Sequence, residues 1–120
     1  TLYCLKENNA AAEQYYNEGK NLERLRTNFE FHLMLASLTD NNMIIILHSL
    51  TCDMLIRFFR LARPSPEMFM KTLHYHRKIV AAIRDREFDK AARVNAEHMR
   101  VASRKMTEKS KQQSYLHVGE

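Results

Sequence analysis

Only two glycines and two prolines interrupt the 120 residues of this chain. These residues supply most of the turns that a β-sandwich or β-barrel needs at short intervals, so their scarcity excludes such folds. Between the interruptions, apolar residues recur three and four positions apart, which is the spacing of one face of an α-helix. The length suits one domain with its own core. The sequence therefore predicts an all-α fold, an antiparallel helical bundle of about five to six helices.

Local signals divide the bundle into helices. Gly19 is a typical residue after a helix C-terminus, and Ser65 followed by Pro66 is a favourable helix start. We expect helices over residues 2–16, 22–38 and 43–62, a fourth from about residue 66 and a fifth from about residue 87. The third is apolar on most sides at its start, which is typical of a helix at the centre of a bundle. The domain is expected to span residues 1–112, with a frayed tail over residues 113–120.

Composition and charge exclude several classes of protein. With 45% hydrophobic and 28% charged residues, the chain has a globular composition and not a disordered one. Most of its net charge of +5 lies in residues 100–112, where no aromatic residue interleaves the basic ones, so a solvated helix end is favoured over a nucleic-acid surface. The longest apolar run, residues 43–47, is too short to cross a membrane. Cys4 and Cys52 are lone thiols, which indicates a reduced, cytoplasmic protein.

Three histidines occupy unusual positions. His32, His76 and His98 each lie within or beside the apolar stripe of a different predicted helix, and Asn28 precedes His32 by one turn on the same face. Facing helices converge in a bundle core, where three neutral imidazoles would suit zinc, nickel, copper or iron. A single histidine on an apolar face is more often a hydrogen-bonded core residue than a ligand. The spacing by itself leaves both interpretations open.

These residues resemble a known family. The segment 28–32 (Asn-Phe-Glu-Phe-His), followed by Asn41, is similar to the D-x-x-F-H…G-N signature of the ligand-binding C-terminal (FCD-type) domain of FadR-subfamily GntR transcription regulators. The later residues are similar to its H-x-x-I…A-I…G-D…A…H pattern, including the separation of 22 residues between His76 and His98. The resemblance covers roughly residues 1–106.

The resemblance implies a metal-binding effector domain and not an enzyme. In the family, the acidic residue and the three histidines bind a divalent metal, and the matching positions here are Asn28, His32, His76 and His98. Asn28 replaces the acidic ligand, so it would bind weakly or be replaced by water. Zinc or nickel is the expected cofactor. Because ligating imidazoles must be neutral, metal affinity is expected to fall as the pH drops through roughly 6.5.

The resemblance also implies partners. The metal would hold a small carboxylate metabolite, whose binding alters the DNA affinity of an N-terminal winged-helix domain that these residues lack. The family's first effector-domain helix is expected to be missing as well. A cytoplasmic homodimer without a membrane partner is expected. Arg57, Asn95 and His48 are the further candidates for effector contacts. Asp40 and Arg86 stand where the family pattern has glycines, which makes the turns unusual.

Two other functions remain open at this point. A helical bundle with three histidines and an open metal position could activate water as a metal-dependent hydrolase. Such an enzyme normally needs a general base beside the metal, and the apolar stripes offer no carboxylate. The other alternative is a metal-free helical interaction module in which the histidines are packed core residues.

Overall fold

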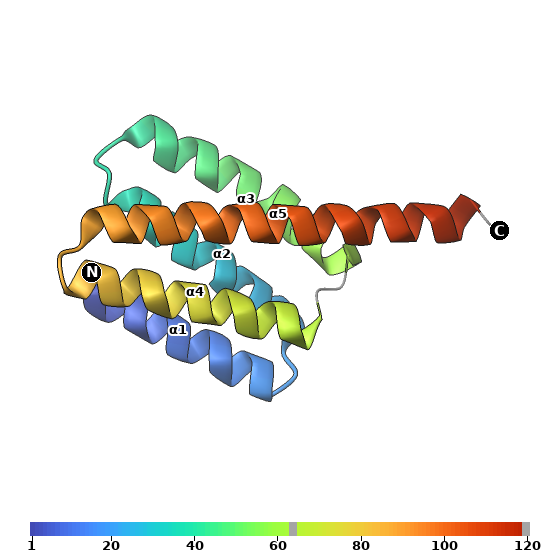
Figure 1. Ribbon diagram of the computed structural model, residues 1–120, viewed down its shortest axis with the longest axis horizontal. Coiled ribbons are helices and arrows are strands. Elements are labelled where there is room, and N and C mark those ends of the chain that lie inside the picture. The colour runs from blue at the N-terminus through green and yellow to red at the C-terminus, as the bar shows by residue number, and fades with distance from the viewer. Residues whose placement is uncertain (63–64, 119–120) are drawn as a thin grey trace. The chain divides into compact units, whose positions relative to one another are not determined.

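The structure, a computed structural model, describes the backbone of residues 1–62 and 65–118 (Figure 1); the side chains of residues 61, 62, 106, 109, 110 and 112–118 lie outside what it describes. Within those ranges it consists of five helices and contains no strand. The helices are α1 (Leu2–Asn17), α2 (Asn21–Ser37), α3 (Asn42–Ala62), α4 (Pro66–Arg84) and α5 (Phe88–Val118). The prediction of an all-α fold is confirmed. The chain divides into two compact units, Thr1–Arg60 and Leu61–Glu120.

The first unit is built on the hairpin of α1 and α2. Its core is formed by apolar side chains that recur at helical spacing on the two helices, and Leu5 and Phe31 are completely buried. A polar contact joins the helices as well, because the buried Asn8 donates from Nδ2 to the backbone oxygen of Thr27 over 3.0 Å. A buried amide nitrogen without an acceptor would be costly, so the contact helps to fix the pairing of α1 with α2.

The third helix, α3, packs against α2 through aromatic side chains. The rings of Phe29 and Phe59 meet edge to face with centroids 5.4 Å apart, a favourable geometry for an aromatic pair. Asn41 caps the start of α3, because its Oδ1 accepts hydrogen bonds from the amides of Met43 and Ile44. The opposite face of α3 is exposed, with Met43 63% accessible. The prediction that α3 lies at the centre of a bundle is therefore wrong.

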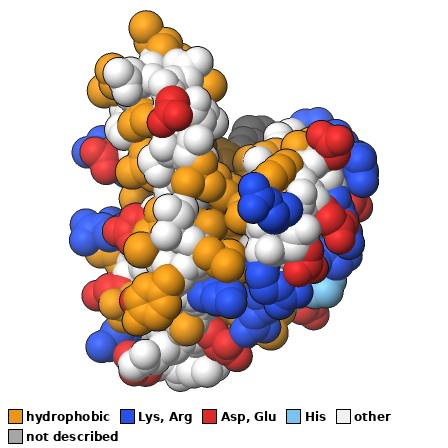
Figure 2. Space-filling view, turned by 90° about the vertical axis from the view of Figure 1, so that its left-hand side faces the viewer, with side chains coloured by type: hydrophobic (Ala, Val, Ile, Leu, Met, Phe, Trp, Pro, Cys, Tyr) orange, Lys and Arg blue, Asp and Glu red, His pale blue; other side chains and the backbone are white. Residues whose placement is uncertain are grey.

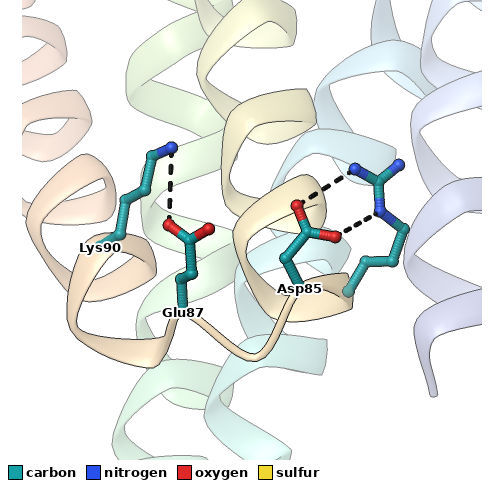
Figure 3. A network of polar contacts seen from close by, with 4 residues as sticks. Asp85, Glu87 and Lys90 are labelled. Atoms are coloured by element: carbon teal, nitrogen blue, oxygen red, sulfur yellow. Dashed lines mark hydrogen bonds and ion pairs between the residues drawn. The ribbon is translucent and has the colours of Figure 1, made fainter.

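The second unit is the hairpin of α4 and α5. Ser65 caps α4 as predicted, since its Oγ accepts a hydrogen bond from the amide of Met68. Apolar residues on one side of α4 are buried, among them Leu73 and Ile79. Charged pairs surround the turn between the helices (Figure 3), where Arg84 contacts Asp85 at 3.0 Å, and Lys90 contacts Glu87 at 3.7 Å. These pairs are exposed to solvent and contribute little to stability.

Two helix ends share one backbone motif with different residues. Gly19 follows α1 with a φ of 71°, and Arg86 follows α4 with a φ of 60°. In both, the amide of the next residue donates to the carbonyl oxygen five residues earlier, over 2.9 and 2.8 Å, which is the Schellman arrangement. Asp40 also has a positive φ, of 55°. The turns therefore keep a left-handed conformation although Asp40 and Arg86 replace glycines of the family pattern.

Replacing Arg86 by Gly is expected to stabilise the protein by about 0.5–1 kcal/mol, because a left-handed conformation strains every residue with a Cβ atom. The matched change is Gly19→Ala, which is expected to cost about 1 kcal/mol. A Cβ atom at Gly19 meets nothing within 4 Å, so that cost comes from the backbone alone. Urea denaturation followed by circular dichroism measures both. Shifts of the same sign in the two variants would contradict this account of the turns.

Two features of the termini and surface complete the fold. The backbone of α5 is helical to Val118, which includes most of the segment predicted as a frayed tail; residues 119–120 lie outside the described residues. The segment Asn42–Arg60 of α3 is long and apolar enough to cross a membrane, with a mean hydropathy of 1.4, and none of that window is buried. One such helix is weak evidence for a membrane span, because it rests on length and composition only.

Candidate metal centre

Two of the predicted ligands meet inside the second unit. His76 projects from α4 and His98 from α5, and the Nε2 atoms of the two rings lie 3.1 Å apart. Both side chains are buried, with exposed fractions of 2% and 3%. The rings are nearly perpendicular, at 83°. One imidazole donates its Nε2 proton to the other when no ion is bound, whereas a shared metal ion would be bound by both Nε2 lone pairs.

The surroundings of His98 keep its ring neutral and fix its orientation. Tyr75, also buried, stacks on the His98 ring with centroids 5.2 Å apart. Burial lowers the pKa of His98 to about 4, because the charged imidazolium loses its hydration. The expected fall of metal affinity near pH 6.5 was based on the ordinary pKa of imidazole, and it therefore does not apply to His98. This imidazole is neutral, as metal binding requires, at any pH well above 4.

The third predicted histidine lies in the first unit. His32 is buried on α2, and the ring of Phe31 contacts it edge to face with centroids 5.5 Å apart. His48 of α3 approaches it from the neighbouring helix, with ring centroids 6.3 Å apart. Asn28 lies one turn before His32 and is half-buried. The first unit thus brings two imidazoles together at the contact of α2 with α3, and Asn28 lies one turn from one of them on α2.

The predicted effector contacts divide into two groups. His48 and Asn95 each keep one polar atom, Nε2 and Oδ1 respectively, buried without a hydrogen-bond partner among the described residues. A buried polar atom without a partner is costly, so each is suited to bind a water molecule or a ligand. Asn95 lies one turn before His98 on α5. Arg57, in contrast, is exposed, and helical spacing places it on the side of α3 opposite His48.

Sequence reasoning missed a cavity in the second unit. A cavity of about 340 Å³ between α4 and α5 reaches His98, and its wall includes Thr72 and Tyr75. Lys71 and Lys105 contribute ammonium groups to its lining, and Glu67 and Glu108 contribute carboxylates. Helical spacing places Lys71 and Tyr75 one turn apart on α4, and this is the signal that could have shown these residues to share a face. A cavity between two helices depends on their packing, so its existence is not readable from the sequence.

Sequence reasoning also missed a buried cation in the first unit. Arg24 is only 8% exposed and lies on α2, one turn before Asn28 and two turns before His32. Burial lowers the pKa of its guanidinium group, which nevertheless stays protonated because arginine titrates far above neutral pH. The face of α2 that carries the imidazole therefore also carries a positive charge.

Comparison with known proteins assigns the family. The family model of the FCD domain matches residues 2–101, which is most of the chain. No curated protein and no solved structure matches the sequence. The chain belongs to the FCD domain family, whose members are the C-terminal effector domains of GntR-family regulators. Such domains regulate transcription factors and are not typically catalytic.

Proposed function

We propose that this domain binds one divalent transition metal, zinc or nickel, through His32, His76 and His98, and that the bound metal holds a small carboxylate metabolite. The observation that carries the proposal is the pair of buried, converging Nε2 atoms of His76 and His98. Membership of the FCD family supports the same assignment, because FCD domains often bind metals. The participation of His32, which belongs to the other unit, is part of the proposal and is tested separately below.

The donor set fits such an ion. Two nitrogens that bind one zinc ion at roughly 2.0–2.1 Å lie about 3.0–3.4 Å from each other, and the Nε2 atoms of His76 and His98 are 3.1 Å apart. Neutral imidazoles are good ligands for zinc, nickel and copper. Asn28 replaces the acidic residue of the family pattern, so water or a weak amide oxygen would complete the coordination. The site then carries one more positive charge than with Asp, which increases its attraction for an anion.

The cavity beside His98 is the candidate site for the carboxylate effector. It has a volume of about 340 Å³, and its lining includes both cations, Lys71 and Lys105, and carboxylates, Glu67 and Glu108. The charge that favours an anion would therefore come from the bound metal. The cavity volume lies at the small end of the range for small-molecule sites. The hydroxyl group of Thr72 supplies a hydrogen-bond donor on the same lining, whereas the Tyr75 hydroxyl already donates to Glu97. His48, Asn95 and Arg57 stay candidates for further effector contacts, the first two because of their unpartnered buried atoms.

Regulation would follow from differential binding. A metal and effector that bind one arrangement of the helices better than another shift the population towards that arrangement. In a GntR-type regulator this bias reaches DNA through a winged-helix domain, which lies outside these 120 residues.

Regulators of this kind act in the cytoplasm, where reduced thiols such as Cys4 and Cys52 are normal. The hydrolase alternative would need a carboxylate base, for which Glu67 and Glu108 of the cavity lining are candidates, but membership of a family that is not typically catalytic argues against it.

Metal content measured by elemental mass spectrometry tests the proposal. Protein purified without chelator and without a nickel column is expected to hold close to one metal ion per chain, whereas His76→Ala should hold almost none, because loss of one imidazole breaks the converging pair. His74→Ala is the matched control. His74 lies two residues away on α4 and is exposed, so this variant should keep its metal.

A further variant isolates the contribution of the first unit. His32→Ala is expected to lose metal as His76→Ala does if the three histidines bind one ion. Full metal retention in His32→Ala would restrict the site to the second unit. An absence of metal in the wild-type protein, even after incubation with zinc, would refute the metal site altogether.

Thermal shift tests the effector. If the wild type holds metal, small dicarboxylates are expected to raise the melting temperature of the metal-loaded wild type only.

A further inference from the structure

The proposed metal site lacks one strong donor. Its histidines supply imidazole nitrogens, but its remaining position is Asn28, whose neutral amide oxygen binds a transition metal more weakly than a carboxylate does. Asn28 lies one turn before His32 on α2 and is half-buried. Protein-bound zinc normally has four ligands. A further nitrogen donor close to His32 would therefore strengthen the site.

His48 of α3 lies beside His32 within the first unit. The centroids of the two rings are 6.3 Å apart, and the ring planes are inclined by 62°. Phe59 lies three turns further along α3 on the same face as His48, and its ring contacts that of Phe29 on α2. Two ring contacts between α2 and α3 thus direct the His48 side chain towards the helix that carries His32 and Asn28.

The Nε2 atom of His48 is a nitrogen without a hydrogen-bond partner. It is buried and has no such partner among the described residues, which is rare for a buried polar atom. Such an atom has lost its hydration without compensation, and a metal ion bound to its lone pair would supply that compensation. Little histidine reaches the surface on the side of the molecule drawn in Figure 2, where lysine and arginine are widely spread.

The distance between the two rings lies within the range for one shared ion. A metal–nitrogen bond of about 2.0–2.1 Å places the centre of an imidazole ring about 3.2 Å from the ion. Two such rings have centroids at most about 6.4 Å apart, and about 5.2 Å apart at a tetrahedral angle. The rings of His76 and His98, at 4.9 Å, are close to the tetrahedral value. His32 and His48 are near the upper limit, so a movement of the His48 ring by about 1 Å would bring this pair to the tetrahedral value.

We propose that Nε2 of His48 is a ligand of the metal ion bound by His32, and that it takes the place of the acidic ligand that Asn28 replaces. The inference rests on the proposed function, because it assigns one more residue to that metal site. It gives His48 a different role from the effector contact expected for it. A neutral imidazole in place of a carboxylate leaves the charge of the ion uncompensated, which preserves its attraction for an anionic effector.

Zinc affinity, measured by competition with a chromogenic chelator, tests the proposal. His48→Phe keeps a ring beside His32 but has no nitrogen. It is expected to bind zinc at least about 100-fold more weakly than the wild type, because even the loss of a residue that only supports a ligand costs about 10–100-fold. Circular dichroism should show the helix content of the wild type. Ser49→Ala is the matched control, since this adjacent residue is exposed and its loss should leave the affinity unchanged.

A second pair of variants tests the replacement of the acidic ligand. Asn28→Asp restores the carboxylate of the family pattern and is expected to bind zinc more tightly than the wild type does. In this background His48→Phe should weaken binding by less than about tenfold, because the carboxylate then supplies the missing donor and the two changes are coupled. An equal loss in both backgrounds would mean that His48 acts through packing, and would overturn the proposal.

Nuclear magnetic resonance of the imidazole nitrogens gives a readout that is independent of affinity. When zinc is added, the signal of His48 Nε2 should shift as those of the other ligating nitrogens do, because its lone pair becomes bound. An unshifted His48 signal in zinc-loaded protein, together with wild-type affinity in His48→Phe, would overturn this inference and leave the proposed function standing. A wild type that binds no zinc would overturn the proposed function and this inference with it.

Discussion

Acidification from about pH 7 to pH 4 is expected to reduce the free energy of unfolding of the metal-free protein by about 3 kcal/mol through His98 alone. The imidazole of the unfolded chain takes up a proton near its ordinary pKa of 6.5, whereas burial lowers the pKa of the folded one to about 4. Between these two pH values only the unfolded chain binds the proton. Stability is therefore constant above about pH 6.5 as far as His98 is concerned, and it falls as the pH decreases towards 4.

Urea denaturation at several pH values, in the presence of a chelator, measures this effect in the wild type and in His98→Gln. Gln can still hydrogen-bond His76 but does not titrate. Acid also affects exposed carboxyl groups: the hydrogen bond from Arg84 lowers the pKa of Asp85, and the hydrogen bond from Gln14 lowers that of Glu18. Those losses are common to both proteins, so the difference between the two curves isolates His98. Parallel curves would show that burial does not hold this imidazole neutral.

Truncation of Phe31 to Ala is expected to cost about 3–5 kcal/mol of stability. The side chain is completely buried in the first unit, so its loss removes apolar burial and leaves a cavity. Small domains have a total stability of about 5–15 kcal/mol, which means that the variant should be partly unfolded well below the melting temperature of the wild type. Thermal and urea denaturation followed by circular dichroism measure the change.

The matched control for Phe31 is Phe88→Ala at the start of α5. The Phe88 side chain is 58% exposed, so its removal should change stability by less than about 1 kcal/mol. Phe31 also contacts the His32 ring, and Phe31→Leu, which preserves most of the buried volume, separates packing from ring orientation. A cost below about 1 kcal/mol for Phe31→Ala would mean that the α1–α2 core is not built around this ring.

Much of the fold was predictable because helix ends are determined locally. The first helix was predicted over residues 2–16 and spans Leu2–Asn17, and the second and third begin one residue before the predicted position. Ser65 caps α4 with its own side chain. These signals act within four residues, between a side chain and a nearby backbone amide, so no tertiary contact is needed to recognise them.

One pair of residues in the candidate site was predictable from the sequence, but the surroundings of that pair were not. Periodicity and motif spacing indicated His76 and His98, whose Nε2 atoms lie 3.1 Å apart. They did not indicate Tyr75 stacked on His98, or His48 beside His32. The sequence gives the angle of a residue around its own helix to within tens of degrees. It does not give the rotation of two helices against each other, on which a ring contact depends.

Sequence alone determined that this chain is helical, where most of its helices begin and end, and to which family it belongs. Tertiary structure decided which apolar faces are covered. The composition of α3 predicted a central helix, yet the structure leaves Leu50 and Met54 exposed at 68% and 71%. The physical reason is that periodicity records which side chains avoid water, whereas the partner that shields them is set by packing between elements far apart in the sequence or by another molecule.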